Sequence, residues 1–106
     1  MAHKDLRSFL AAIEASGDLV KVDDQVDWDQ ELSGIGRLSC ERYGPAFMFN
    51  NIKDYPEWRT IANPVAGWRR YAVGLGLPAD TSVRDLYKVY AEREVDLIPP
   101  VVVKDG

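Results

Sequence analysis

Cysteine and histidine, the side chains best suited to nucleophilic catalysis and metal binding, occur once each in this chain of 106 residues. Cys40 falls on a predicted helix and His3 lies near the N-terminus, so the sequence offers no base oriented toward the thiol. We interpret Cys40 as a small buried or half-buried side chain and His3 as a surface residue. This usage also excludes a disulfide framework, a zinc finger and a His-rich metal site.

Acidic side chains form the strongest charge feature. Asp27, Asp29 and Glu31 occupy positions 1, 3 and 5 of a calcium-binding loop. The pattern then fails, because Leu32 replaces the glycine of position 6 and Leu38 replaces the glutamate of position 12. We interpret these acids as a solvated surface and a helix start, where negative charge is favourable. An acidic metal-binding protein is the alternative, and it predicts stabilisation by calcium.

Two glycine-rich segments resemble phosphate-binding motifs in their residue pattern but not in their predicted structural context. Residues 74–79 match G-x-G-x-x-A, but a dinucleotide site needs these glycines between a strand and a helix. Here they close a predicted helix, and Pro78 removes a backbone amide. Gly34-Ile35-Gly36 lacks the third glycine. We therefore expect a helix stop followed by a turn at residues 74–79.

Aromatic and cationic side chains alternate in Trp58-Arg59 and in Trp68-Arg69-Arg70-Tyr71. Binders of single-stranded nucleic acid use this combination, but the net charge of −4 argues against a phosphate backbone as partner. Residues 1–50 hold the whole excess, with 5 basic and 9 acidic groups. Trp, Tyr and Arg dominate protein interfaces, so we predict an interaction surface built on Trp58, Trp68 and Arg70.

Hydrophobic spacing predicts the elements that position these residues. The first helix is capped by Asp5 and ended by Gly17, and a strand follows at residues 19–22. A second helix over about 29–42 is indicated by apolar residues at helical spacing, which are Trp28, Leu32, Ile35 and Leu38. Strands follow at 46–49 and 59–62, then a short helix from Trp68, and a last helix capped by Thr81 or Ser82 with Val83, Leu86, Tyr87 and Tyr90 as its apolar face. The sequence thus predicts an α+β fold of order αβαββαα, in which a three- to four-stranded sheet packs with about four helices.

The remaining organisation follows from length and composition. The chain suits one domain, which we place at residues 1–97, and 98–106 read as a proline-rich linker entering a C-terminal strand. The sequence shows no signal peptide, and its apolar runs are far shorter than a membrane span, so we expect a cytoplasmic protein with no membrane partner.

Five separated regions resemble the UbiD family of carboxy-lyases, and the likeness extends over essentially the whole chain. They are DLRSFL (5–10) with GDLVKV (17–22), GPAFMFNNIK (44–53), NPVAGWRR (63–70), LGLP (75–78) and PPV (99–101). Within this family, the sequence is most similar to the large subunits of bacterial phenolic-acid decarboxylases of the vanillate or 4-hydroxybenzoate type.

This resemblance implies a parent enzyme that decarboxylates aromatic or α,β-unsaturated acids without oxidation. Such enzymes use prenylated FMN with a divalent metal, usually Mn²⁺, and K⁺. Their catalytic, metal-binding and flavin-binding groups lie in a split-barrel domain after the proline linker, and none has a counterpart here. The resemblance therefore assigns no catalytic, cofactor-binding or metal residue to this chain, and the chain alone is expected to be inactive.

The function expected from the resemblance is that of an N-terminal structural and assembly domain. Its partner would be the flavin-binding split-barrel domain, in cis or in trans, and the parent would be a homo-oligomer. The chain would then be a truncated chain, a proteolytic fragment or a split gene product. The alternative is a free-standing assembly or adaptor module that binds a separately encoded partner.

Overall fold

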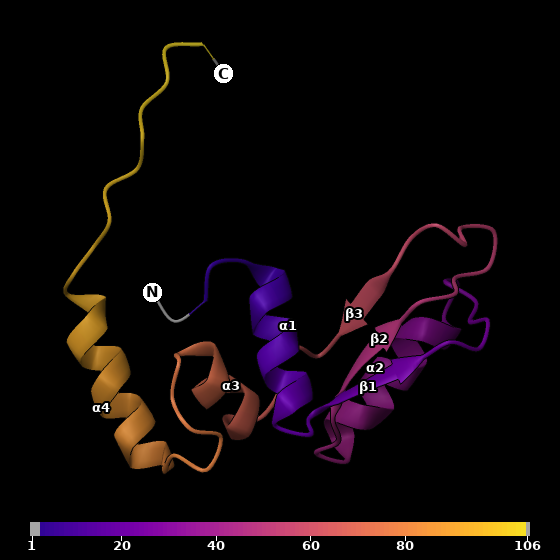
Figure 1. The fold of residues 1–106 in the computed structure, drawn as a ribbon, viewed down its shortest axis with the longest axis horizontal. Coiled ribbons are helices and arrows are strands. Elements are labelled where there is room, and N and C mark those ends of the chain that lie inside the picture. The colour runs from indigo at the N-terminus through magenta and orange to yellow at the C-terminus, as the bar shows by residue number, and fades with distance from the viewer. Residues whose placement is uncertain (1–2, 106) are drawn as a thin grey trace.

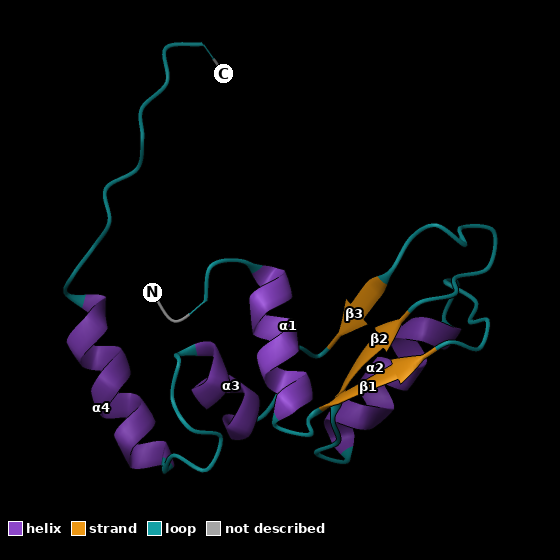
Figure 2. Cartoon of the chain, in the orientation of Figure 1, coloured by secondary structure: helices purple, strands orange, loops and turns teal. Residues whose placement is uncertain are grey.

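The elements follow one another in the order expected for this α+β chain (Figure 1, Figure 2). The structure is a computed structural model, and it describes residues 3–105. The elements are α1 (Leu6–Ala15), β1 (Leu19–Val22), α2 (Glu31–Glu41), β2 (Ala46–Phe49), β3 (Thr60–Ala62), α3 (Trp68–Gly74) and α4 (Val83–Glu94). The predicted order αβαββαα is confirmed, with three strands in the sheet.

The sheet has the spatial order β1-β2-β3 and mixes both kinds of pairing. β1 runs parallel to β2, with Leu19 opposite Ala46, because α2 carries the chain back between them. β2 runs antiparallel to β3, with Phe49 opposite Thr60. The loops that follow β1 and β2 therefore meet at one end of the sheet, at the right of Figure 1.

The main core lies where α1 meets the sheet and α3. Asp5 begins α1 as predicted, since its carboxylate accepts a hydrogen bond of 2.8 Å from the Ser8 amide while the Ser8 hydroxyl accepts from the Asp5 amide. α1 then buries one face at i, i+1 and i+4. The buried residues of this core are Phe9, Leu10, Ile13, Ala46 and Val73.

The fully buried residues of α2 are small, and of the four apolar residues expected along this helix Leu32 and Ile35 are half-buried. Gly36 and Ser39 are buried, and a Cβ on Gly36 would lie 3.1 Å from that of Ala62. The expected apolar face is thus wrong at Trp28 and Leu38, which are exposed. The physical reason is the close approach of α2 to the sheet, which only small side chains allow.

The glycines of residues 74–79 end a helix, as predicted. Gly76 has φ of +75°, and its amide donates to the Val73 carbonyl over 2.9 Å. The Leu77 amide donates to the Ala72 carbonyl, also over 2.9 Å. These two bonds form a Schellman motif, in which glycine adopts the left-handed conformation at low cost. The amides thus satisfy carbonyls of the helix.

α4 rests on the rest of the fold through few residues. Ser82 caps it, since the Ser82 hydroxyl accepts from the Asp85 amide. Leu86 is buried, but Tyr87 and Tyr90, expected on the same apolar face, are exposed. α4 is the longest helix with 12 residues, and no helix within residues 3–105 is long and apolar enough to cross a membrane.

The segment after α4 corrects one expectation. Residues 98–105 form no strand; they run outward from the body as an extended, exposed segment (Figure 1). Val101 and Val102 are among the most exposed apolar residues of the chain. A run of valines favours β-structure only where a neighbouring strand is available to pair with it, and no such strand lies beside it among the described residues.

Candidate functional site

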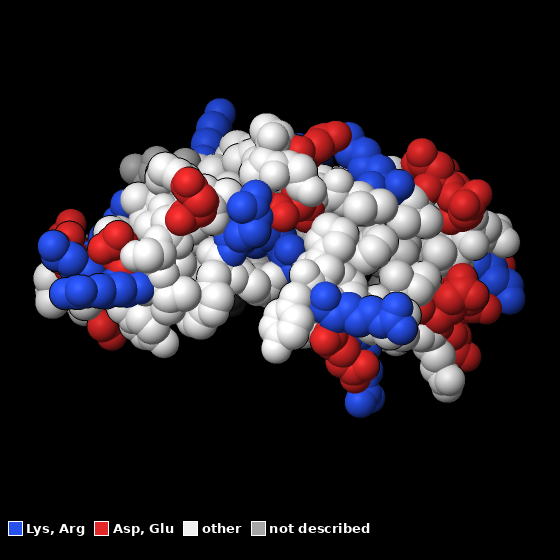
Figure 3. All heavy atoms as spheres, turned by 90° about the horizontal axis from the view of Figure 1, so that it is seen from below, with Lys and Arg blue, Asp and Glu red and all other residues white. Residues whose placement is uncertain are grey.

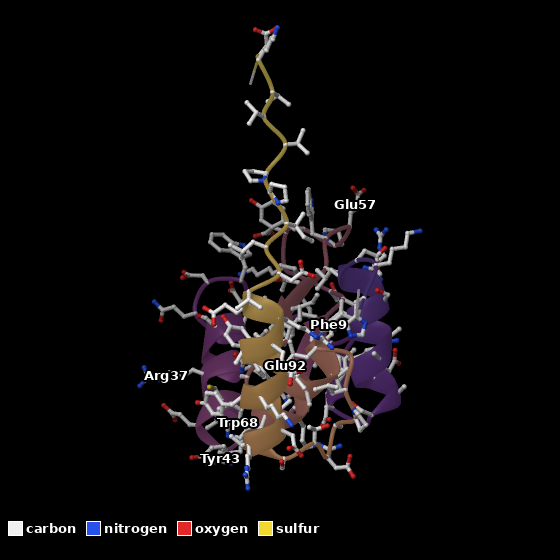
Figure 4. The ribbon with its side chains drawn as sticks, turned by 90° about the vertical axis from the view of Figure 1, so that its left-hand side faces the viewer. Phe9, Arg37, Tyr43, Glu57, Trp68 and Glu92 are labelled. Carbon is white, nitrogen blue, oxygen red and sulfur yellow. The ribbon has the colours of Figure 1, made fainter. Side chains whose placement is uncertain are left out.

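Exposed aromatic side chains gather at two separate places, each beside a groove. The Trp58 surface, beside a groove of about 510 Å³, consists of Trp28, Leu32, Ile52, Tyr55, Trp58 and Thr60. The Trp68 surface consists of Tyr43, Val65, Trp68, Tyr87 and Tyr90. Figure 4 shows Tyr43 and Trp68 near one end of the molecule and Glu57, the neighbour of Trp58, near the other. The two tryptophans predicted to share an interaction surface thus lie on different ones.

The Trp68 surface is built on helices. Trp68 begins α3 and its indole contacts the rings of Tyr71 and Tyr87, with centroids 6.2 and 6.1 Å apart. On one side of Trp68 a groove of about 820 Å³ extends to Tyr43 at the end of α2. On the other side a smaller hollow of about 240 Å³ reaches Tyr90 on α4. The two hollows share Trp68, so the surface is continuous from α2 to α4.

Tyr43 is a functional candidate that the sequence did not reveal. It is 96% exposed, and its φ of +54° lies in the left-handed region. Its amide and that of Gly44 close α2 by donating to the carbonyls of Cys40 and Ser39. Glycine is the usual residue at this position, and a bulky one is strained there. The sequence pointed instead to the break at Gly44-Pro45.

Arg70 lies inside the fold rather than on its surface. Its side chain is only 5% exposed, and its guanidinium donates to the carbonyls of Asn63 and Gly44 over 3.1 Å each and to that of Ala66. Burial lowers the pKa of this guanidinium, and the nearby Asp18 carboxylate opposes that shift. The surface position that we expected for Arg70 is therefore wrong, because carbonyls from two loops accept its hydrogen bonds. The interface formed by the three residues stays a prediction.

The Trp58 surface is built on loops that backbone hydrogen bonds hold together. Val26 and Ile52, both buried, pair as an isolated bridge between the loop after β1 and the loop after β2. The amides of Tyr55 and Trp58 continue this frame by donating to the carbonyls of Ile52 and Tyr55 over 2.9 and 3.1 Å. The ring of Trp28 lies edge-on to that of Tyr55, with centroids 6.3 Å apart. Trp58 itself is 69% exposed.

The acidic residues Asp27, Asp29 and Glu31 lie at the start of α2, in agreement with the interpretation as a helix start. An Asp27 oxygen accepts from the Asp29 amide over 2.9 Å, and Glu31 accepts from the Asp27 amide. The second Asp27 oxygen pairs with Lys53 over 3.2 Å. The hydrogen bond from Asp29, followed by that from Lys53, lowers the pKa of Asp27 below its usual 3.8. These oxygens are thus engaged within the chain.

Cys40 and His3 lie in other surroundings than those expected. Cys40 is exposed, and not buried or half-buried, because α2 turns its small residues toward the sheet at Gly36 and Ser39. His3 is half-buried: its ring lies 5.4 Å from that of Phe9, and Nε2 lies within hydrogen-bond distance of the Val73 carbonyl. His3 thus packs on the core, since the segment before α1 folds back onto α3.

The adjacent guanidinium groups of Arg69 and Arg70 are both engaged within the chain. Residues 3–105 contain no group of three or more His, Cys, Asp or Glu placed to hold a metal. Arg69, which together with Arg70 could neutralise a phosphate, pairs with Asp18 over 3.1 Å. The Arg70 guanidinium is taken up by backbone carbonyls. We therefore assign no reaction step on this chain to a cofactor.

Fold and sequence together place the chain in a known family. Residues 10–90 match the family UbiD_N, described as the 3-octaprenyl-4-hydroxybenzoate carboxy-lyase N-terminal domain. The chain belongs to this UbiD N-terminal domain family, as the resemblance predicted.

The relatives are decarboxylases several times longer than this chain. The phenolic acid decarboxylase of Bacillus subtilis (strain 168) is 35% identical over 103 residues, which are 95% of this chain and 22% of the relative. The Escherichia coli O157:H7 protein of the same name is 36% identical over 87 residues, or 79% and 18% of the two chains. The vanillic acid decarboxylase of Sedimentibacter hydroxybenzoicus in its closed form superposes with a TM-score of 0.84 at 32% identity, over 96% of this chain and 22% of that one. This chain therefore spans about a fifth of the relatives it matches.

Proposed function

We propose that this chain is the N-terminal structural and assembly domain of a non-oxidative decarboxylase that acts on aromatic, phenolic or α,β-unsaturated carboxylic acids. The observation that carries the proposal is the match of residues 10–90 to the UbiD N-terminal domain. The substrate class is supported by the names of the relatives, which are phenolic acid and vanillic acid decarboxylases. At about a third identity, such a likeness supports the reaction class more strongly than the individual acid.

In this proposal the domain provides contact surfaces, and the remainder of the enzyme carries the catalytic and cofactor-binding groups. The prenylated FMN, Mn²⁺ and K⁺ implied by the family resemblance would bind in the flavin-binding split-barrel domain. The exposed Trp68 surface supports a docking role, since exposed aromatic clusters of this kind mark protein interfaces. The parent enzyme would be a cytoplasmic homo-oligomer.

A test of this division uses the purified 106-residue chain. The chain is incubated without oxygen with prenylated FMN, Mn²⁺ and K⁺ and is then given vanillate or 4-hydroxybenzoate. We expect no flavin absorbance to remain after gel filtration and no release of carbon dioxide. The Bacillus subtilis relative, treated in parallel, is the positive control. Retained yellow colour together with carbon dioxide release from the short chain would refute the proposal.

The second candidate is a free-standing adaptor that binds a separately encoded partner. The exposed Trp58 surface favours it, because this surface lies far from the segment after α4 (Figure 1). An intact mass of the protein from its native source distinguishes the two. A mass several times 11.9 kDa supports the domain of a longer enzyme, whereas 11.9 kDa together with a co-purifying partner supports the adaptor.

A further inference from the structure

We propose that the Trp58 surface is a docking site for a basic protein surface, and that an arginine side chain of the partner lies against the exposed rings of Trp28, Tyr55 and Trp58. This inference goes beyond the proposed domain function, which does not require any particular partner at this end of the molecule. Three features carry it: the exposed faces of the rings, the frame that holds them, and the charge around them.

The rings are exposed and yet held in place. Trp28, Tyr55 and Trp58 are each more than half exposed. Backbone hydrogen bonds fix the turns beneath them, and the buried bridge between Val26 and Ile52 joins the two loops. A cation that approaches such rings meets negative π-faces at little ordering cost, because the loops need no rearrangement.

The charge around the rings is strongly negative. Each ring directly follows an acid in the chain: Trp28 follows Asp27, Tyr55 follows Asp54, and Trp58 follows Glu57. The two loops, residues 23–31 and 53–59, hold seven acidic and two basic residues, a net charge of −5 against −4 for the whole chain. Figure 3 shows acidic side chains gathered at this end of the molecule, at the right of the view.

Of the three acids that directly precede the rings, two are available to a partner. Asp27 is already paired with Lys53. Asp54 and Glu57 are exposed, and within residues 3–105 neither forms an ion pair. An arginine placed against the rings would therefore contact both a π-face and an unpaired carboxylate. Arginine suits this environment better than lysine, because its planar guanidinium stacks on aromatic faces and pairs with a carboxylate through two hydrogen bonds.

The charge balance of the rest of the chain argues against a second copy of this domain as the partner. Outside the two loops the chain carries eleven basic and ten acidic residues, so it offers no strongly basic surface in return. Nucleic acid is excluded by the same negative charge. The partner is therefore a different protein surface that is rich in arginine.

The experiment titrates the 106-residue chain with a blocked tetra-arginine peptide at low ionic strength and follows the indole N–H signals by NMR. The chain has three tryptophans, so each signal is assigned from a single Trp→Phe variant. We expect saturable shifts of the Trp28 and Trp58 signals and a constant Trp68 signal. Tetra-lysine should bind more weakly and tetra-glutamate should leave all three signals unchanged. Added salt should weaken binding, because it screens the exposed acids.

Matched variants separate the site from a general attraction of a basic peptide to an acidic protein. Trp58→Ala should weaken tetra-arginine binding about two- to fivefold, the range of an exposed cation–π contact. Trp68→Ala should leave the affinity unchanged. Glu57→Gln should weaken binding about twofold, whereas Glu92→Gln on α4, which lies apart from Glu57 in Figure 4, should not.

Four outcomes would overturn the proposal. They are the absence of any shift with peptide at millimolar concentration, an equal shift at Trp68, wild-type affinity in Trp58→Ala, and shifts that depend on protein concentration alone. The last outcome would assign the surface to a second copy of this chain.

Discussion

The Trp58 surface and the Trp68 surface share a side-chain chemistry but differ in what supports them. The Trp58 surface lies on two loops joined by backbone hydrogen bonds and surrounded by acids. The Trp68 surface lies at the end of α2, at the start of α3 and along α4, and the buried guanidinium of Arg70 connects the loops beneath it. The Trp58 surface is thus surrounded by negative charge. The Trp68 surface is mainly aromatic, and the buried Arg70 guanidinium stabilises the loops beneath it.

The two surfaces also differ in their position relative to the end of the chain. α4 contributes Tyr87 and Tyr90 to the Trp68 surface and leads directly into residues 95–105. The Trp58 surface lies at the opposite end of the molecule (Figure 1). If the flavin-binding domain follows α4, as proposed, the Trp68 surface shares α4 with the connection to it, although the segment after α4 runs toward the end opposite Trp68 and Tyr43 (Figure 4). Under the two proposals above, the two aromatic surfaces of this small domain would bind two different partners.

The largest expected effect comes from removing the support of the Trp68 surface. Arg70→Ala leaves the carbonyls of Gly44, Asn63 and Ala66 without their donor. Buried unsatisfied groups are costly, so we expect the free energy of unfolding to fall by about 3 kcal/mol. Urea denaturation measures it.

The control for this change is Arg69→Ala. Arg69 is half exposed and pairs with Asp18, so its loss should cost less than 1 kcal/mol. In Arg70→Ala the NMR signal of the Trp68 indole should broaden or move, while those of Trp28 and Trp58 stay in place. Equal losses for the two arginines would contradict the assigned role of Arg70.

A smaller effect of opposite sign is expected at Tyr43. Tyr43→Gly relieves a φ of +54° that glycine adopts without strain. We expect the isolated chain to gain about 0.5–1 kcal/mol of stability. Under the proposed function, the same change should weaken docking to the rest of the enzyme, since it removes a ring that is 96% exposed.

Thermal unfolding and a binding measurement on the full-length enzyme check the two halves of this prediction. Tyr55→Gly on the Trp58 surface is the comparison, since Tyr55 has no positive φ and should only lose stability. A loss of stability in Tyr43→Gly would show that the exposed ring serves the fold rather than a partner.

The smallest effect concerns the Trp58 surface and depends on pH. The pKa of Asp27 is lowered below its usual 3.8 by the Asp29 amide and then by Lys53, so its charged form stabilises the folded chain. This contribution is present above pH 3.8 and is lost as the pH falls through the lower folded value. Asp27→Asn should therefore reduce the Tm slightly at pH 7. The difference in Tm from wild type should close in strong acid, where the Asp27 carboxyl is protonated in both the folded and the unfolded chain.

The strands and the ends of α1, α3 and α4 were predictable because they rest on local chemistry. Asp5 and Ser82 cap their helices through their own side chains, and Gly17 and Gly76 adopt the positive φ that ends a helix. Such signals act within a few residues of the chain, so the sequence alone contains them.

The features that escaped prediction depend on long-range contacts. The buried face of α2 consists of small residues because Gly36 approaches Ala62, which lies on β3. Arg70 is buried because carbonyls from other loops converge on it. The pattern of aromatic and cationic residues identified Trp58 and Trp68 but not their separation, since neighbours along the chain do not reveal which end of a fold they occupy.

The measurement that tests the central claim most directly is hydrogen–deuterium exchange. It compares the 106-residue chain in isolation with the same residues within the full-length enzyme. The claim is that the domain acts through surfaces and not through chemistry of its own. We predict slower exchange within the enzyme for residues 65–71 and 83–94, which carry the Trp68 surface, with unchanged exchange in the core of α1. Identical exchange throughout the domain in both samples would contradict the account.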